Sequence, residues 1–120
     1  MQRDRGAKLS LSILDAIRFA HLSGPRQTLV RLCQVVNYGY IQELNVRNSD
    51  PVFDPPPLVL LDVKLDSDNG PRPEADLADF ELRHEFCRLM IQLDELINAR
   101  IERIEVRAGI PRRVLFRLAG

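Results

Sequence analysis

Apolar residues along this chain change their spacing from that of a helix to that of a strand, and they do so twice. Between residues 29 and 36 they recur every three or four positions, as on one face of a helix. From Tyr40 onward apolar and polar residues alternate, as on the two faces of a strand. The same change occurs near residue 100, after a longer apolar stripe over residues 82–97. The pattern predicts a helix followed by strands, used two times.

The two transitions also share their letters. Residues 41–51 read IQELNVRNSDP, and residues 101–111, sixty positions later, read IERIEVRAGIP. Isoleucine, the Val-Arg pair and proline fall at the same offsets in both stretches. We interpret this as one helix–hairpin (αββ) unit written twice. Chance similarity over so short a stretch is the alternative.

Alternation assigns two faces to each predicted strand. In the first unit, one face is expected to carry Gln42, Leu44 and Val46, and the other Glu43, Asn45 and Arg47. The run LVLLDVKL at residues 58–65 is predicted as the partner strand, with an apolar face formed by Val59, Leu61, Val63 and Leu65. In the second unit, residues 100–107 and 112–118 are predicted to pair across a turn at residues 108–111. The inward positions expected there are Ile104, Val106, Val114, Phe116 and Leu118.

Helix-capping and turn residues set the predicted boundaries. Ser23-Gly24-Pro25 is expected to end an N-terminal helix, and Thr28 to cap the helix that follows. Asp76 or a neighbouring residue is expected to cap the long second helix, since acidic residues are favoured in the first turn. The predicted segments are a loose tail (1–8), the N-terminal helix (9–25), the first αββ unit (26–65), a loop (66–76) and the second αββ unit (77–120).

These elements predict a single α+β domain. A two-stranded hairpin is marginal alone, so the hairpins are expected to join in one sheet or to pair across a dimer. The expected architecture is an antiparallel sheet of about four strands, with helices packed on one face and an extra N-terminal helix. A composition with 45% hydrophobic residues provides enough apolar material for a core.

Charge and cysteine content narrow the class of protein. The net charge is zero, but residues 1–47 carry +4, residues 48–99 carry −8 and residues 100–120 carry +4. A dedicated nucleic-acid binder usually has a clear basic excess, which the whole chain lacks. Two cysteines, Cys33 and Cys87, are expected to be buried thiols and not a disulfide framework. With no signal-peptide pattern and no apolar run of membrane-spanning length, the protein is expected in the cytoplasm.

Three short stretches are candidates for chemistry or binding. Asp54-Pro55-Pro56-Pro57 favours an extended polyproline conformation, which either docks into a partner or serves as a stiff spacer. Arg72, held between two prolines, is a possible anion contact or a partner for nearby carboxylates. His84 and Cys87 have helical spacing for two metal ligands, but a zinc site needs three or four, so no metal is predicted. No catalytic signature is present and no cofactor is predicted.

Residues 13–47 have the outline of a winged helix-turn-helix. On that interpretation the second helix would offer four side chains to nucleic acid: Arg26, Gln27, Arg31 and Gln34. The alternative is a helical hairpin that packs on the sheet. We favour the helical hairpin, because few positive charges are available there to neutralise phosphates.

Three stretches together resemble a group of small, uncharacterised bacterial proteins. These stretches are residues 36–41 with Asn37-Tyr38-Gly39, residues 51–57 with Asp54-Pro55-Pro56-Pro57, and residues 69–74, which read NGPRPE. The group shows the same order of N-[FY]-G, D-P-P-P and N-G-P-R-P-E. The resemblance covers residues 29–118 and implies a small bacterial cytoplasmic protein with a single repeated unit. It carries over no functional residue.

The pattern favours a non-enzymatic module that binds protein, including a second copy of itself. Mixed charges on the outward strand faces, including Arg47 and Arg107, would pair across a homodimer. The nucleic-acid binder that uses residues 13–47 is the alternative, and a small enzyme without a recognisable motif is third.

Overall fold

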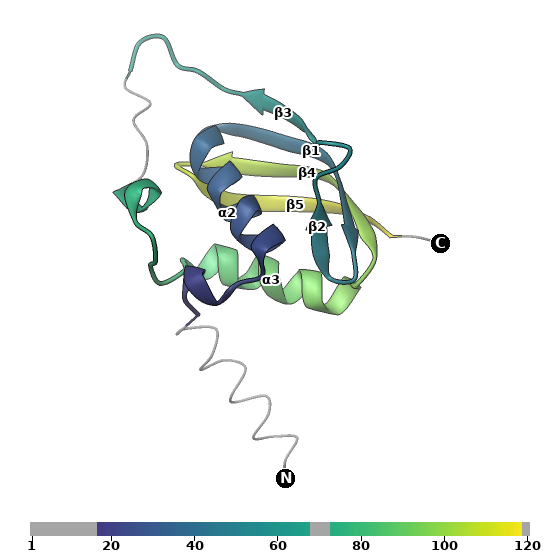
Figure 1. Ribbon diagram of the computed structural model, residues 1–120. Helices are drawn as coiled ribbons and strands as arrows, with labels where there is room; N and C mark the ends of the chain where they lie inside the picture. The colour runs from purple at the N-terminus through teal and green to yellow at the C-terminus, as the bar shows by residue number, and fades with distance from the viewer. Residues whose placement is uncertain (1–16, 68–72, 119–120) are drawn as a thin grey trace.

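The computed structural model describes residues 17–67 and 73–118 (Figure 1). Residues 9–16 of the predicted N-terminal helix, the tail before it, and Arg72 lie outside the described residues. The described residues form two α-helices, α2 (Gly24–Val36) and α3 (His84–Leu96). Two short 3-10 helices, η1 (Phe19–His21) and η2 (Pro73–Asp76), precede them. The strands are β1 (Gly39–Arg47), β2 (Asp50–Val52), β3 (Leu58–Leu61), β4 (Ala99–Arg107) and β5 (Ile110–Leu118).

One open antiparallel sheet joins all five strands. Its order is β2-β1-β4-β5, and β3 pairs with β1 as well. Both β2 and β3 lie along β1: β2 pairs with residues 45–47, and β3 pairs with residues 39–42. The α+β class is therefore confirmed. The sheet has five strands and not four, because proline-rich residues 53–57 interrupt the outer strand and proline cannot donate to a ladder.

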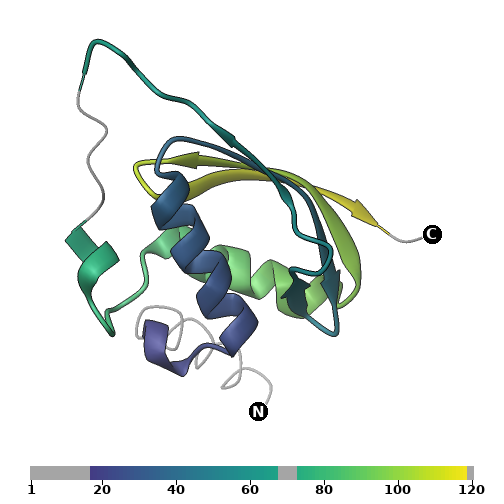
Figure 2. The same cartoon turned by 45° about the horizontal axis from the view of Figure 1, so that its top comes forward.

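The core lies between the helices and the two central strands. Figure 2 shows α2 and α3 on the concave side of the curved sheet, with the opposite side left uncovered by either helix. Buried side chains from α2, α3, β1 and β4 form one cluster. Leu44, Val46, Ile104 and Val106, predicted as core, are all buried.

The predicted strand faces in β1 are wrong at Gln42. Glu43 has a φ of 60°, which is outside the strand region and shifts the alternation by one residue. As a result Ile41, Leu44 and Val46 are buried, and Gln42 is only half-buried. In β5, Leu118 was expected inward but is exposed.

Both predicted helix starts are also wrong. Residues 17–23 do not continue a helix to residue 25, because Ser23 caps the start of α2: its Oγ accepts a hydrogen bond from the Arg26 backbone N–H at 3.3 Å. Thr28 lies inside α2 and donates to the Gly24 carbonyl. Asp76 ends η2, and α3 begins only at His84.

Equivalent elements lie sixty residues apart along the chain. The starts of α2 and α3, of β1 and β4, and of β2 and β5 all share this offset. The ladder between the central strands keeps it too, since Ile41 pairs with Ile104 and Leu44 pairs with Ile101.

Two hydrogen bonds at matching positions connect the first set of elements (α2, β1 and β2) with the second set (α3, β4 and β5). The Gly109 N–H donates to the Asn37 carbonyl at 2.8 Å, and the Ser49 N–H donates to the Ile97 carbonyl at 2.8 Å. Asn37 and Ile97 each follow a helix, with φ and ψ near 60° and −63°. These are the angles of a γ-turn, a rare conformation. Each helix end is therefore tied to the hairpin turn of the other set.

Candidate interaction surface

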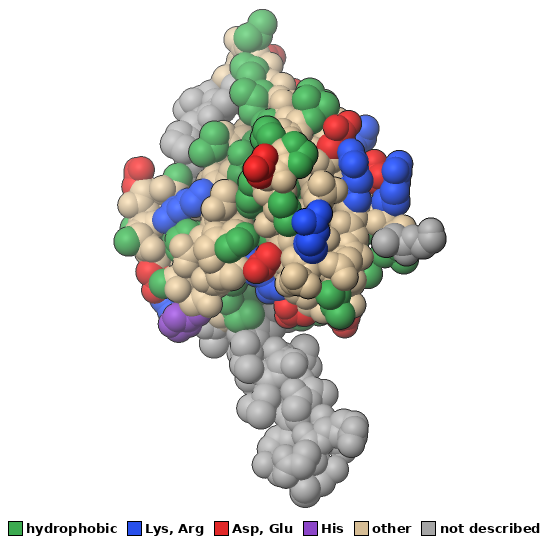
Figure 3. All heavy atoms as spheres, turned by 45° about the vertical axis from the view of Figure 1, so that its right-hand side comes forward, with side chains coloured by type: hydrophobic (Ala, Val, Ile, Leu, Met, Phe, Trp, Pro, Cys, Tyr) green, Lys and Arg blue, Asp and Glu red, His purple; other side chains and the backbone are tan. Residues whose placement is uncertain are grey.

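Residues Leu58–Leu65, here named the apolar arm, run along one edge of the sheet and beyond it. Figure 1 shows β3 rising from the sheet into an extended segment, and Figure 3 shows hydrophobic side chains along this protrusion. The exposed fractions of its apolar side chains are Leu58 47%, Val59 37%, Leu60 43%, Leu61 62%, Val63 58% and Leu65 96%. The predicted strand is confirmed only over residues 58–61, and its apolar face does not enter the core.

The sheet holds the arm by one backbone edge. β3 pairs with residues Gly39–Gln42 of β1, and no other strand of residues 17–67 and 73–118 pairs with it. A row of backbone N–H and C=O groups that is not matched by a strand is a template for strand pairing. The arm therefore combines apolar side chains with an open backbone edge.

Gly39 allows β3 to lie against β1. A Cβ at this position would sit 2.0 Å from the Leu60 carbonyl oxygen, and the φ of Gly39 is +154°. No other residue type fits there without moving the arm. The turn after α2 is made by Asn37 and not by this glycine.

The opposite edge of the sheet differs from the arm. β5 is nine residues long, contains Pro111, and carries three exposed arginines, Arg112, Arg113 and Arg117. Leu115 and Leu118 are its exposed apolar side chains, and they are separated by Phe116 and Arg117. Charge and proline on an edge strand are the features by which natural sheets discourage pairing.

A groove of about 570 Å³ lies between α3 and β5. Its floor includes Leu89, Val114 and Phe116, and its rim carries Arg88, Arg112 and Arg113. Arg112 forms an ion pair with Glu85 at 3.0 Å. His84 also lines this groove, whereas Cys87 is buried, so the two do not converge as metal ligands. Among the described residues no group of three or more His, Cys, Asp or Glu side chains is placed to hold a metal ion.

The face of the sheet opposite the helices carries ion pairs within the chain. Arg117 pairs with Glu102 at 2.6 Å, and Arg107 with Glu105 at 3.2 Å. The Arg103 guanidinium lies over the Tyr40 ring, 5.0 Å from its centroid. Arg47 and Arg107, predicted as interaction residues, lie at the ends of two antiparallel neighbouring strands, so the structure does not bring them together.

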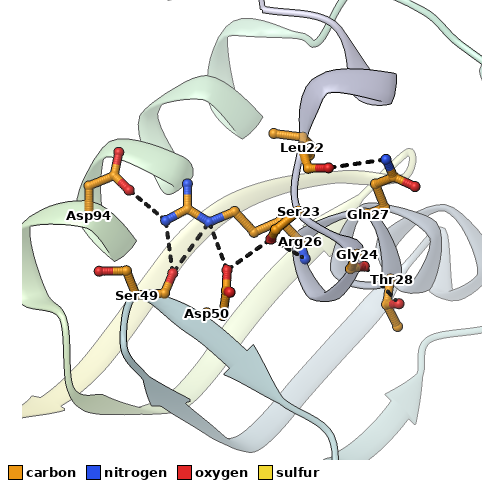
Figure 4. Close-up of polar contacts among 9 residues, drawn as sticks. All are labelled: Leu22, Ser23, Gly24, Arg26, Gln27, Thr28, Ser49, Asp50 and Asp94. Carbon is orange, nitrogen blue, oxygen red and sulfur yellow. Dashed lines mark hydrogen bonds and ion pairs between the residues drawn. The ribbon is translucent and has the colours of Figure 1, made fainter.

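Arg26, proposed for nucleic acid, is held inside the molecule (Figure 4). Its side chain is 13% exposed and contacts Asp94 at 2.5 Å and Asp50 at 3.3 Å. It also donates to the Ser49 carbonyl at 2.8 Å. Gln27 donates to the Leu22 carbonyl at 3.2 Å. Both side chains fix the start of α2 to its neighbours.

Arg31 and Gln34 have the same internal role. Arg31 donates to the carbonyls of Glu74 and Leu77, and its guanidinium lies 4.3 Å from the centroid of the Phe19 ring. Gln34 is buried and accepts a hydrogen bond from Arg31 at 2.9 Å. The outward helix face expected from the sequence is thus covered by η1, η2 and their neighbours.

The proline segment connects β2 to the apolar arm. Asp54, Pro55 and Pro56 are exposed and Pro57 is half-buried. This location fits the spacer role that the sequence allowed, since the segment fixes where β3 begins.

The two cysteines are buried and neither forms a disulfide with the other. Burial raises the pKa of the Cys33 thiol to about 12, because the charged thiolate is disfavoured away from water. At neutral pH this thiol therefore stays protonated and unreactive.

Comparisons with known proteins add no family or activity. The sequence matches no family model and no curated protein, and the structure matches no solved structure. In the part of the chain that the structure describes, no helix has both the length and the apolar character needed to cross a bilayer.

Proposed function

We propose that this chain is a non-enzymatic protein-binding module that forms a homodimer, and that the apolar arm is its contact surface. The observation that carries the proposal is the exposure of six apolar side chains over Leu58–Leu65. Three of them, Leu61, Val63 and Leu65, have exposed fractions above 50%. Contiguous apolar surface of this kind marks interaction sites in proteins that are otherwise folded and water-exposed.

The structure around the arm supports a binding role and not a defect in folding. The central strands β1 and β4 bury Ile41, Ile101 and Ile104 fully. Gly39 is shaped to let the arm lie in place, and the proline segment sets where it starts. Because the core is well buried, poor core formation does not explain the exposure of β3.

We also propose that residues 24–61 and 84–118 are two copies of one αββ unit related by a two-fold axis between β1 and β4. The shared offset of sixty residues, the self-consistent ladder and the two crossing hydrogen bonds support this. On this view β3 takes in the first copy the place that residues 115–118 of β5 take in the second, since Leu61 pairs with Gly39 and Leu118 pairs with Ala99.

Sedimentation velocity with two matched variants tests the function. Leu61 and Leu118 are each 62% exposed and end the strands on opposite edges of the sheet. We expect the unmodified protein to sediment as a dimer at tens of micromolar, Leu61→Asp as a monomer, and Leu118→Asp as a dimer. Circular dichroism confirms that each variant is folded.

Two results would overturn the proposal. One is a monomer for the unmodified protein whose sedimentation does not change on tenfold concentration. The other is a dimer that Leu61→Asp and Leu118→Asp weaken equally. Salt-dependent binding to duplex DNA by the monomer would instead support the nucleic-acid alternative.

A further inference from the structure

We infer that β3 pairs antiparallel with β3 of a second copy, about a two-fold axis normal to the sheet, so that two sheets become one. This inference rests on the proposed self-association and states how it is built. All helices then lie on one side of a continuous sheet of two chains. The occupant of the open edge is thus a second copy of this chain.

The backbone edge points to a strand as the occupant. One edge of β3 is paired with Gly39–Gln42 of β1, and no described strand pairs with its other edge. Those N–H and C=O groups are best matched by another extended chain, which supplies donors and acceptors at the same repeat. A helix or a flat apolar surface would leave them without backbone partners.

The side chains point to the same strand from another copy. Residues 58–61 are Leu, Val, Leu and Leu, so both faces of β3 are apolar and neither carries charge. When such a strand pairs with itself, apolar side chains face apolar side chains on both surfaces of the sheet. No like charges are brought together within this stretch.

The other edge of the sheet is a poorer match. Pairing β3 with β5 of another copy would place Leu and Val beside Arg112, Arg113 and Arg117. That contact is also head-to-tail, so it would leave one open edge on every added copy and would grow into fibres. Pairing of β3 with β3 closes after two copies and leaves only the charged edges exposed.

The proline segment sets where the two-fold axis falls. Residues 55–57 have no backbone N–H groups, so the new ladder must lie on the C-terminal side of them. A ladder over residues 58–62 puts Leu60 on the axis, and a ladder over residues 58–64 puts Leu61 there. The two-fold axis places this residue opposite the same residue of the other copy. The two side chains then point to the same face of the sheet, as opposite residues in an antiparallel pair do.

The contact area is small, so we expect a weak dimer. Six partly exposed side chains per copy can bury less surface than the roughly 800 Å² per partner of a stable interface. We therefore expect a dissociation constant in the low micromolar range, on the order of 1–10 μM.

Disulfide scanning tests the geometry. Cys33 and Cys87 are buried, so a cysteine introduced on the surface is the accessible thiol in native protein. Leu58→Cys, Val59→Cys, Leu60→Cys and Leu61→Cys are each oxidised mildly at micromolar concentration, and the yield of linked dimer is measured. Leu118→Cys is the control, because it matches Leu61 in exposure on the opposite edge.

We expect one sharp maximum, at Leu60→Cys or Leu61→Cys, at least fivefold above Leu118→Cys. A residue on the axis faces its own copy at a Cα separation of about 4.5–5.5 Å, within disulfide reach. Its neighbours are offset from their own copies by about two residues, or ~7 Å along the strand, which is too far.

Equal yields at all five positions, with a dimer still present in sedimentation, would overturn the strand pairing while leaving self-association intact. The competing receptor is then the groove between α3 and β5, whose arginines would match Asp62 and Asp66 of the arm. Mixing Leu61→Cys with Arg113→Cys detects it, because only an arm seated in the groove links these two proteins. A monomeric unmodified protein would remove the proposed function itself.

Discussion

Arg26 in α2 and Phe86 in α3 are each the third residue of their helix and lie sixty positions apart, yet they stabilise the helix start by different means. Arg26 contacts Asp50 of the first hairpin through charge (Figure 4). Phe86 is buried, and so is Ile110, which lies sixty residues after Asp50. One backbone arrangement therefore accepts a polar network in one place and buried apolar residues at the positions sixty residues later.

The outer strands differ in a second way. β5 runs without a break along β4 and carries three arginines, whereas its counterpart is divided into β2 and β3 by the proline segment. The first edge resists pairing and the second presents the apolar arm. Two edges with the same position in the sheet thus have opposite tendencies toward other strands.

The largest expected difference lies at the helix starts. Phe86→Ala should lower the free energy of unfolding by about 3–5 kcal/mol, because it leaves a cavity in the core. Arg26→Ala should cost about 1–2 kcal/mol, since it removes charge-assisted hydrogen bonds whose carboxylate partners are partly in water. Urea denaturation measures both. Only Arg26→Ala should reduce the salt dependence of stability, and equal salt dependence in the two variants would contradict the comparison.

The central strands should respond alike. Leu44 and Ile104 occupy matching positions in β1 and β4, and both are fully buried. Truncation of either to alanine should cost about 2–4 kcal/mol. The two losses should agree within about 1 kcal/mol, because the surrounding core is shared. A loss below about half a kcal/mol at either position would remove that strand from the core.

The sequence predicted the parts of the fold that depend on local pattern. The predicted turn at residues 108–111 and the alternation in residues 104–107 located β4 and β5, although β5 begins at Ile110 and not at the predicted residue 112. The start of α2 was not predictable in this way, because Ser23-Gly24-Pro25 suits both the end of one helix and the start of the next. The start of α2 is decided by the short η1 segment before it. This segment is held by contacts with Asp79, whose carboxylate accepts a hydrogen bond from the Ala20 N–H.

The candidate surface was predicted as a strand but not as a surface. An unbroken apolar run such as LVLL is typical of a buried strand, so residues 58–61 looked like core. Their exposure depends on which layers cover the sheet, and no local signal carries that information. The bulge at Glu43 could not be predicted either, because glutamate is not a residue type that favours a positive φ.

The turns after the two helices have the same conformation but different residue types. Asn37 and Ile97 share the same backbone angles, which suit asparagine far better than a β-branched residue. Ile97→Asn should therefore raise the free energy of unfolding by about 1 kcal/mol through relief of backbone strain. Leu115→Asn, which replaces an exposed residue within β5, is the control and should not stabilise. A loss of stability in Ile97→Asn would show that packing outweighs strain there.

The smallest effects are expected in the two hairpin turns. Asn48-Ser49 and Ala108-Gly109 have φ values between 54° and 74° at both central residues, as a type I′ turn requires. Asn-Gly is the preferred pair for this turn, and each natural turn contains one of its two residues. Ser49→Gly and Ala108→Asn complete the pair, and each should raise the free energy of unfolding by about half a kcal/mol.

The hydrogen bonds of these turns make the test specific. Ser49 and Gly109 use their backbone N–H groups to reach the ends of the opposite helices, so the substitutions leave those bonds intact. The reverse change, Gly109→Ser, is the control and should cost about 0.5–1 kcal/mol, because it places a Cβ at a φ of 74°. Thermal denaturation of the four proteins measures the series. If Gly109→Ser is neutral while Ser49→Gly stabilises, the two turns differ in their preference for glycine at the second central residue. The two hairpin turns would then not be equivalent.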